Sequence, residues 1–148
     1  NMLGIAEITD PTHPNLISVF PYPEVPEGYT HGSNFNIVDG VRIPFGPHNV
    51  FDAFGQPWLE NRDDRVYCCY FNAGLRIYDV SDPFVPKEIA YFLPADPKGE
   101  DWFNNEDGTL LPGPKVAITE DVVVDDRGFI YVDAYQDGLY ILKCTLDK

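Results

Sequence analysis

The sequence predicts an all-β fold built from short strands that repeat along the chain. Its 14 prolines and 12 glycines separate short apolar runs, a spacing that is typical of strands joined by tight turns. No apolar pattern with a period of 3.6 residues is long enough for a useful helix. Two stretches of sequence also recur, and recurrence at a long period is typical of folds made from stacked units.

The first repeat joins the beginning of the chain to its middle. Residues 3–14, LGIAEITDPTHP, recur as residues 75–86, LRIYDVSDPFVP, and an apolar run follows each copy. Both copies end in Asp-Pro-x-x-Pro, which predicts a turn because proline fixes φ and the aspartate before it can bond its own backbone. Each copy is therefore expected to form a strand and a turn that leads into a second strand.

The second repeat joins the middle to the end. Residues 66–77, VYCCYFNAGLRI, recur as residues 130–141, IYVDAYQDGLYI, and each copy predicts two strands joined by a turn containing glycine. Runs such as 122–124, which are apolar on both faces, suit a sheet sandwiched between other sheets. The copies lie about 64 and 72 residues apart, which exceeds the spacing of compact repeats and predicts insertions.

The unit GLRIYDVSDP at residues 74–83, followed by a proline-led strand, resembles the repeat of the LVIVD-repeat β-propeller family. The resemblance implies a partial β-propeller of about two and a half four-stranded blades, matching carboxyl-terminal blades of such a ring. Closure takes at least four blades, so another chain or a missing segment would complete it. The implied parts are the outer half of a blade (1–20), an insertion (21–47), a full blade (48–92), a second insertion (93–119) and the first three strands of another blade (120–148).

The acidic composition argues against nucleic acid and anionic membrane surfaces as partners. The chain has 10 basic and 24 acidic residues, whereas phosphate binding needs a basic patch. No run approaches the roughly 18 apolar residues of a spanning helix. The opening residues, Asn1 to Gly4, have neither the basic region nor the apolar core of a signal peptide. Asn1 is not a typical translation start, so the cellular location stays open.

The three cysteines are expected to be buried structural thiols. Cys68, Cys69 and Cys144 include no CxxC pair for zinc or redox chemistry. Adjacent residues of a strand point to opposite faces, which disfavours a disulfide between Cys68 and Cys69.

Candidate functional residues lie where the two insertions end. In propeller geometry both insertions enter inner strands and cover one face, the mouth of the central channel. The inner strands then begin at matching positions, His48-Asn49 and Glu120-Asp121. Imidazole and carboxylate groups can act as acid and base or bind a divalent metal. His48, Glu120 and Asp121 are therefore candidate catalytic residues, and His48 and Glu120 are candidate metal ligands.

The alternative is that Asn49 and Asp121 bond backbone at the strand starts, while His48 and Glu120 face channel water. Asn49 is also a candidate for binding a ligand, together with His31 of the first insertion and the turn residues Asn72, Gln136 and Asp137. The ordinary interpretation of His31 is an exposed loop histidine, and that of Asn72, Gln136 and Asp137 is residues that form tight turns.

Two classes of function remain open, because folds of this kind host many functions. In the first, the mouth binds a small molecule and is the site of a metal-assisted or acid/base enzyme. In the second, the chain is a noncatalytic platform for protein partners. Ionisable residues and both insertions on one face favour the first, while substrate, reaction and metal identity are not encoded in any recognisable motif.

Overall fold

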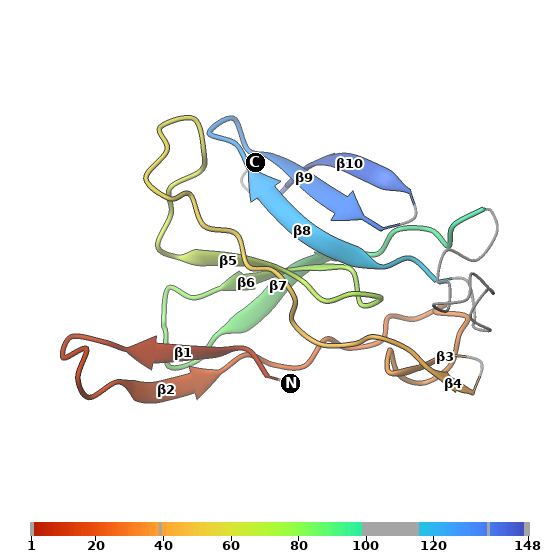
Figure 1. Ribbon diagram of the computed structural model, residues 1–148, viewed down its shortest axis with the longest axis horizontal. Coiled ribbons are helices and arrows are strands. Elements are labelled where there is room, and N and C mark those ends of the chain that lie inside the picture. The colour runs from red at the N-terminus through yellow and green to blue at the C-terminus, as the bar shows by residue number, and fades with distance from the viewer. Residues whose placement is uncertain (1, 39, 99–115, 136, 147–148) are drawn as a thin grey trace, which may run out of the picture.

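The computed structural model describes residues 2–38, 40–98, 116–135 and 137–146 (Figure 1). This part of the chain contains strands and no helix, and hence no helix that could cross a membrane. The all-β prediction is confirmed. The strands are β1 (Gly4–Glu7), β2 (Asn15–Val19), β3 (Ile37–Val38), β4 (Val41–Arg42), β5 (Arg65–Cys69), β6 (Leu75–Asp79), β7 (Lys87–Phe92), β8 (Thr119–Val124), β9 (Phe129–Ala134) and β10 (Gly138–Lys143).

The strands form four small antiparallel sheets. Their orders are β1-β2, β3-β4, β5-β6-β7 and β10-β9-β8. Figure 1 shows the β5-β6-β7 sheet between the β1-β2 hairpin and the β8-β9-β10 sheet. Among the residues described, the sheets close into no barrel or ring, so the partial propeller stays a prediction.

Residues 48–51 extend the β5-β6-β7 sheet along the free edge of β5. Val50 forms an antiparallel bridge with Cys68. The amide of His48 donates to the carbonyl of Cys69 at 2.8 Å, and the amide of Phe51 donates to that of Tyr67 at 3.0 Å. The central sheet therefore has four antiparallel segments, in the order residues 48–51, β5, β6 and β7.

Strand pairing in the central sheet recurs in the β8-β9-β10 sheet with the same register. Positions that correspond in the sequence repeats also have corresponding partners across the strands, so the repeat holds for the backbone as well as for the residues. The matching pairs are Val50–Cys68 with Val122–Val132, and Tyr67–Ile77 with Tyr131–Ile141.

The β1-β2 hairpin repeats the β6-β7 hairpin, including its irregularity. A bulge interrupts the first hairpin between Ile5 and Ala6 and the second between Ile77 and Tyr78, at positions that correspond in sequence. Their turns match as well, because Asp10 and Asp82 each accept a hydrogen bond at 3.0 Å from the amide two residues later. A bulge is a defined feature of a strand pair, so its recurrence shows that these hairpins share one design.

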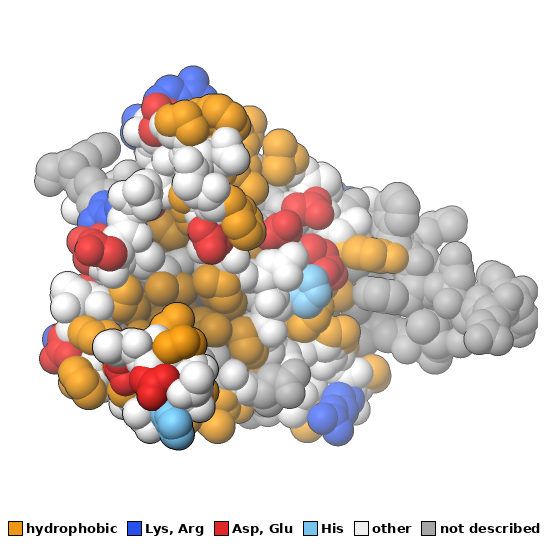
Figure 2. Space-filling model, turned by 60° about the vertical axis from the view of Figure 1, so that its left-hand side comes forward, with side chains coloured by type: hydrophobic (Ala, Val, Ile, Leu, Met, Phe, Trp, Pro, Cys, Tyr) orange, Lys and Arg blue, Asp and Glu red, His pale blue; other side chains and the backbone are white. Residues whose placement is uncertain are grey.

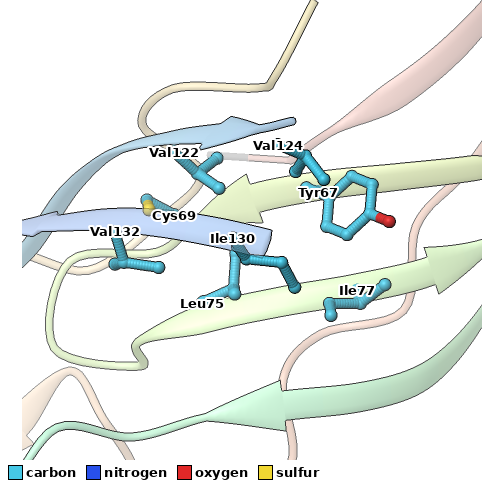
Figure 3. Close-up of a cluster of buried hydrophobic side chains, with 8 residues drawn as sticks. All are labelled: Tyr67, Cys69, Leu75, Ile77, Val122, Val124, Ile130 and Val132. Carbon is cyan, nitrogen blue, oxygen red and sulfur yellow. The ribbon is translucent and has the colours of Figure 1, made fainter. Parts of the chain in front are cut away.

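Both faces of the central sheet are buried. One face packs against the β8-β9-β10 sheet, and the eight side chains of this cluster interdigitate in Figure 3. They are Tyr67, Cys69, Leu75 and Ile77 from the central sheet, with Val122, Val124, Ile130 and Val132 from the neighbouring one. On the opposite face Cys68, Tyr70 and Tyr78 pack with Phe20 and Phe35. Alternation along β5 therefore sends neighbouring side chains into two different cores.

The outward faces of the two flanking sheets are uncovered in the described structure. Leu139 and Ile141 of β10 are each 61% exposed, although the corresponding Leu75 and Ile77 are only 1% and 4% exposed. On the β1-β2 hairpin, Leu16 is 69% exposed. Figure 2 shows one face of the molecule, on which hydrophobic side chains lie between acidic ones.

Truncating Ile77 is expected to destabilise the fold. Because Ile77 is 4% exposed inside the larger core cluster, Ile77→Ala should lower the free energy of unfolding by about 2 to 5 kcal/mol. Denaturant titration followed by circular dichroism measures this change. Val85→Ala is the control, since Val85 is 54% exposed in the β6-β7 turn, and its effect on unfolding should be small. Equal losses in the two variants would contradict this assignment of the core.

Candidate functional site

His48 and Glu120, which the sequence places at corresponding strand starts, are in contact. His48 Nδ1 lies 2.7 Å from the backbone carbonyl oxygen of Glu120 and 3.4 Å from its Oε2. Both side chains are about one-third exposed, at 36% and 27%. When Nδ1 carries the proton and donates it to the carbonyl, Nε2 of the neutral ring is the atom that can accept a proton or bind a metal.

The Phe71 carbonyl ties this pair to the central sheet. It accepts hydrogen bonds from the amide and Oγ1 of Thr119, both at 3.0 Å, and from the amide of Gly74 at 3.1 Å. Phe71 has a φ of 52°, in the left-handed region that non-glycine residues seldom adopt. Its ring packs on that of His48, with 4.6 Å between centroids. The turn after β5 therefore fixes both the histidine ring and the first residue of β8.

Asp121 has a different environment from its two expected companions. Its Oδ1 accepts a hydrogen bond at 2.8 Å from the amide of Val122, which is the strand-start role that the alternative interpretation gave it. It also pairs across the strands with the exposed Asp133. Asn49 bonds the central sheet through its backbone carbonyl, which accepts from the amide of Cys69 at 3.0 Å.

The described residues contain no group of three or more His, Cys, Asp or Glu side chains that could hold a metal ion. His48 and Glu120 together offer one imidazole nitrogen and one carboxylate, which is fewer ligands than the three or four protein groups of a typical site. The His48–Glu120 pair could therefore supply two ligands of a metal site that needs further ligands. The same two groups could also act as an acid/base pair.

The two insertions meet at a cavity of about 310 Å³. His31 of the first insertion bonds Asp96 of the second, with 2.8 Å between Nε2 and Oδ2. Residues of both insertions, of β7 and of the turn after β5 form the wall. They are Pro26, Glu27, Gly28, Tyr29, Thr30, His31, Asn72, Tyr91, Leu93, Pro94, Ala95, Asp96, Val116 and Ala117.

Asn72 is a buried polar residue in this wall. It is 5% exposed, and its Nδ2 donates to the hydroxyl oxygen of Tyr29 at 3.3 Å. Its Oδ1 is buried and has no hydrogen-bond partner within the described chain. Asn72 directly follows Phe71, so the cavity and the His48–Glu120 pair share one turn.

The remaining candidates behave as ordinary turn residues or lie outside the described residues. Asp137, in the turn before β10, accepts a hydrogen bond at 3.1 Å from the hydroxyl of Tyr140 in that strand. Gln136 lies outside the described residues. His13, to which the sequence gave no role, bonds Asp10 at 2.9 Å within the Asp-Pro turn.

Sequence reasoning missed Tyr29, Tyr91 and Asp96 as cavity residues. Tyr91 could have been found from its place in β7, which borders the turn after β5. Tyr29 and Asp96 carry no comparable signal, because they lie in insertions that match nothing else in the chain.

Comparisons with protein-family models, with curated proteins and with solved structures find no match.

The cysteines at the centre of the fold are held as protonated thiols. Cys68 and Cys69 are buried in the two different cores on either side of β5, as strand alternation predicts, and neither forms a disulfide. Burial raises the pKa of each thiol to about 12. Because the thiolate is the reactive species, neither is available as a nucleophile near neutral pH.

Alkylation should therefore distinguish the three cysteines. In the folded chain at neutral pH, iodoacetamide should label the half-buried Cys144 and leave Cys68 and Cys69 unmodified, since their thiols stay protonated until the pH approaches 12. Intact mass should show one adduct in the native state and three in denaturant. Cys144→Ser should remove the native adduct, and labelling of Cys68 in the folded chain would contradict the burial described.

Proposed function

We propose that this chain is part of a β-propeller of the LVIVD-repeat kind and that it binds a small molecule where its two insertions meet. The observation that carries the binding proposal is the cavity in which His31 and Asp96 join the insertions beside the buried Asn72. Concave sites with a few converging polar groups in a largely apolar wall are the usual form of small-molecule sites.

The partial propeller is supported by the repeated strand register. The central unit shares cross-strand pairs and a bulge with the first unit, and it shares other cross-strand pairs with the last unit. A stack of such units buries both faces of every inner sheet, and the central sheet is buried in that way. The first unit has only the two strands β1 and β2, and the last has β8, β9 and β10, which fits a segment of a larger ring.

A partner polypeptide is supported by the uncovered outer faces. Leu139 and Ile141 lie at positions whose counterparts, Leu75 and Ile77, are almost completely buried by a neighbouring sheet. Exposed apolar faces of this kind favour association. We propose that another chain, or a segment outside this sequence, covers them.

The chain should therefore associate with a partner polypeptide or with itself when it is produced as residues 1–148. Ile141→Lys should shift the assembly towards smaller species, because a charge on that face opposes its burial. Light scattering measures the mass. Val85→Lys is the matched control, since Val85 is 54% exposed in the β6-β7 turn. A soluble, folded monomer of residues 1–148, seen by light scattering and circular dichroism, would contradict the proposal.

The His48–Glu120 pair supports a chemical role next to the cavity. His48 Nε2 could take or give a proton, and Glu120 could stabilise the charged ring, which is the arrangement that acid/base catalysis uses. Alternatively, both groups could bind a divalent metal whose other ligands come from the partner. Asp121, which bonds the start of β8, would act by positioning Glu120.

A noncatalytic platform for protein partners is the second candidate. It is favoured by the same uncovered face of β10, where Leu139 and Ile141 are exposed. In that case binding of the partner would itself be the function, and the His48–Glu120 pair would be a structural contact between β8 and the central sheet.

Replacing His48 separates these two functions. If the pair is chemical, His48→Ala should abolish binding of a divalent metal, or of a ligand that the pair contacts, while the assembly persists and the melting temperature falls only slightly. The slight fall is expected because a side chain that is 36% exposed loses its ring contact with Phe71 and its hydrogen bond to the Glu120 carbonyl, whereas a lost ligand removes a direct bond. Metal content, calorimetry and thermal melting measure the three quantities.

His13→Ala is the control, because His13 bonds only within the Asp-Pro turn. Equal metal and ligand occupancy in wild type, His48→Ala and His13→Ala would favour the protein-interaction platform over the chemical site.

A further inference from the structure

Among the residues that the structure describes, the wall of the cavity between the insertions contains carboxylates and no Lys or Arg side chain. Glu27 and Asp96 contribute carboxylates, and His31 is paired with Asp96. Arg76, which is fully buried, stacks on the ring of the wall residue Tyr91 and is paired with Glu88 at 2.9 Å. An anionic ligand would therefore be repelled by the two carboxylates of the described wall, whereas a cation would be attracted to them.

Asn72 requires a hydrogen-bond donor. A buried acceptor without a partner is destabilising, and Oδ1 of Asn72 is such an acceptor. In the orientation described, Nδ2 already donates to Tyr29, which leaves Oδ1 to accept from a ligand.

Aromatic rings complete the wall. Tyr29 and Tyr91 both line the cavity, and the face of a tyrosine ring attracts an ammonium group within about 6 Å of its centre. Tyr91 already makes such a contact with Arg76, whose Cζ lies 4.9 Å from the ring centroid. Carboxylates, an unpaired acceptor and aromatic faces together select for positive charge and N–H donors.

We propose that the cavity binds a small organic ammonium ion, with its N–H groups directed to Asn72 Oδ1 and its charge near Asp96. This inference rests on the proposed small-molecule function and names the class of ligand. A cavity of about 150 Å³ accommodates benzene, so about 310 Å³ accommodates a one-ring amine with room for a short chain. The net charge of −14 also favours encounter with cations.

The test compares benzylamine, benzyl alcohol and benzoate, which share one ring and similar size but are a cation, a neutral molecule and an anion at neutral pH. Calorimetric titration gives affinity, and amide chemical shifts of residues 27–31, 93, 95 and 96 report the location. Benzylamine should bind about fivefold more tightly than benzyl alcohol. Benzoate should bind more weakly than either. The protein is used in whatever assembly residues 1–148 form.

Asp96→Asn is the informative variant, because it removes one charge from a residue that is half exposed and so should leave the fold intact. It should weaken benzylamine about fivefold and leave benzyl alcohol unchanged. Asp82→Asn is the matched control, since it removes the same charge from a turn that does not line the cavity and should change neither affinity.

Equal or tighter binding of benzyl alcohol or benzoate, or an equal loss in both variants, would overturn the ammonium assignment while leaving a small-molecule site in place. Absence of binding by benzylamine would also overturn it. If, in addition, a broad set of neutral and anionic small molecules left the amides of residues 27–31, 93, 95 and 96 unshifted, the proposed function itself would fail.

Discussion

Burial of the central sheet on both faces is the constraint on which the other features depend. Because β5 and β6 lie between two layers, their buried apolar side chains pack into one of two separate cores. This requirement explains why Cys68 and Cys69 are adjacent yet belong to different cores. It also fixes the edge at which residues 48–51 pair with β5, and hence the place of His48. The geometry of the candidate site is thus a consequence of packing in the central sheet.

The strand pattern could be predicted from the sequence because the chain contains its own comparison. Leu3, Leu75 and Leu139 occupy corresponding places in repeated segments, and the pairing of β1, β6 and β10 follows that correspondence. The contact between His48 and Glu120 was predictable for the same reason, since both stand at the start of corresponding segments. The position of the Asp121 side chain was harder to predict, because its carboxylate accepts a hydrogen bond from the amide of Val122 instead of joining the His48–Glu120 pair.

The cavity could not be predicted in the same way. It is formed by two insertions that resemble neither each other nor the repeats, so nothing in the sequence indicates that His31 contacts Asp96. The left-handed backbone conformation of Phe71 could not be predicted from the sequence either, because such a conformation is expected at glycine or asparagine. It is maintained by the hydrogen bonds that its carbonyl accepts from Thr119 and Gly74. Contacts between non-repeated segments depend on long-range packing, which local residue preferences do not specify.

The exposed Asp133 has a consequence for the order in which sheets stack. It occupies the position that Cys69 fills in the central sheet, where the thiol is fully buried against β8 and its neighbours. If the last sheet took the place of the central one, a carboxylate would enter that dry core, at a large cost in solvation. The two sheets share a backbone plan but are not interchangeable. The carboxylate of Asp133 therefore disfavours stacking in which the last sheet takes the central position, and so favours one order of the sheets.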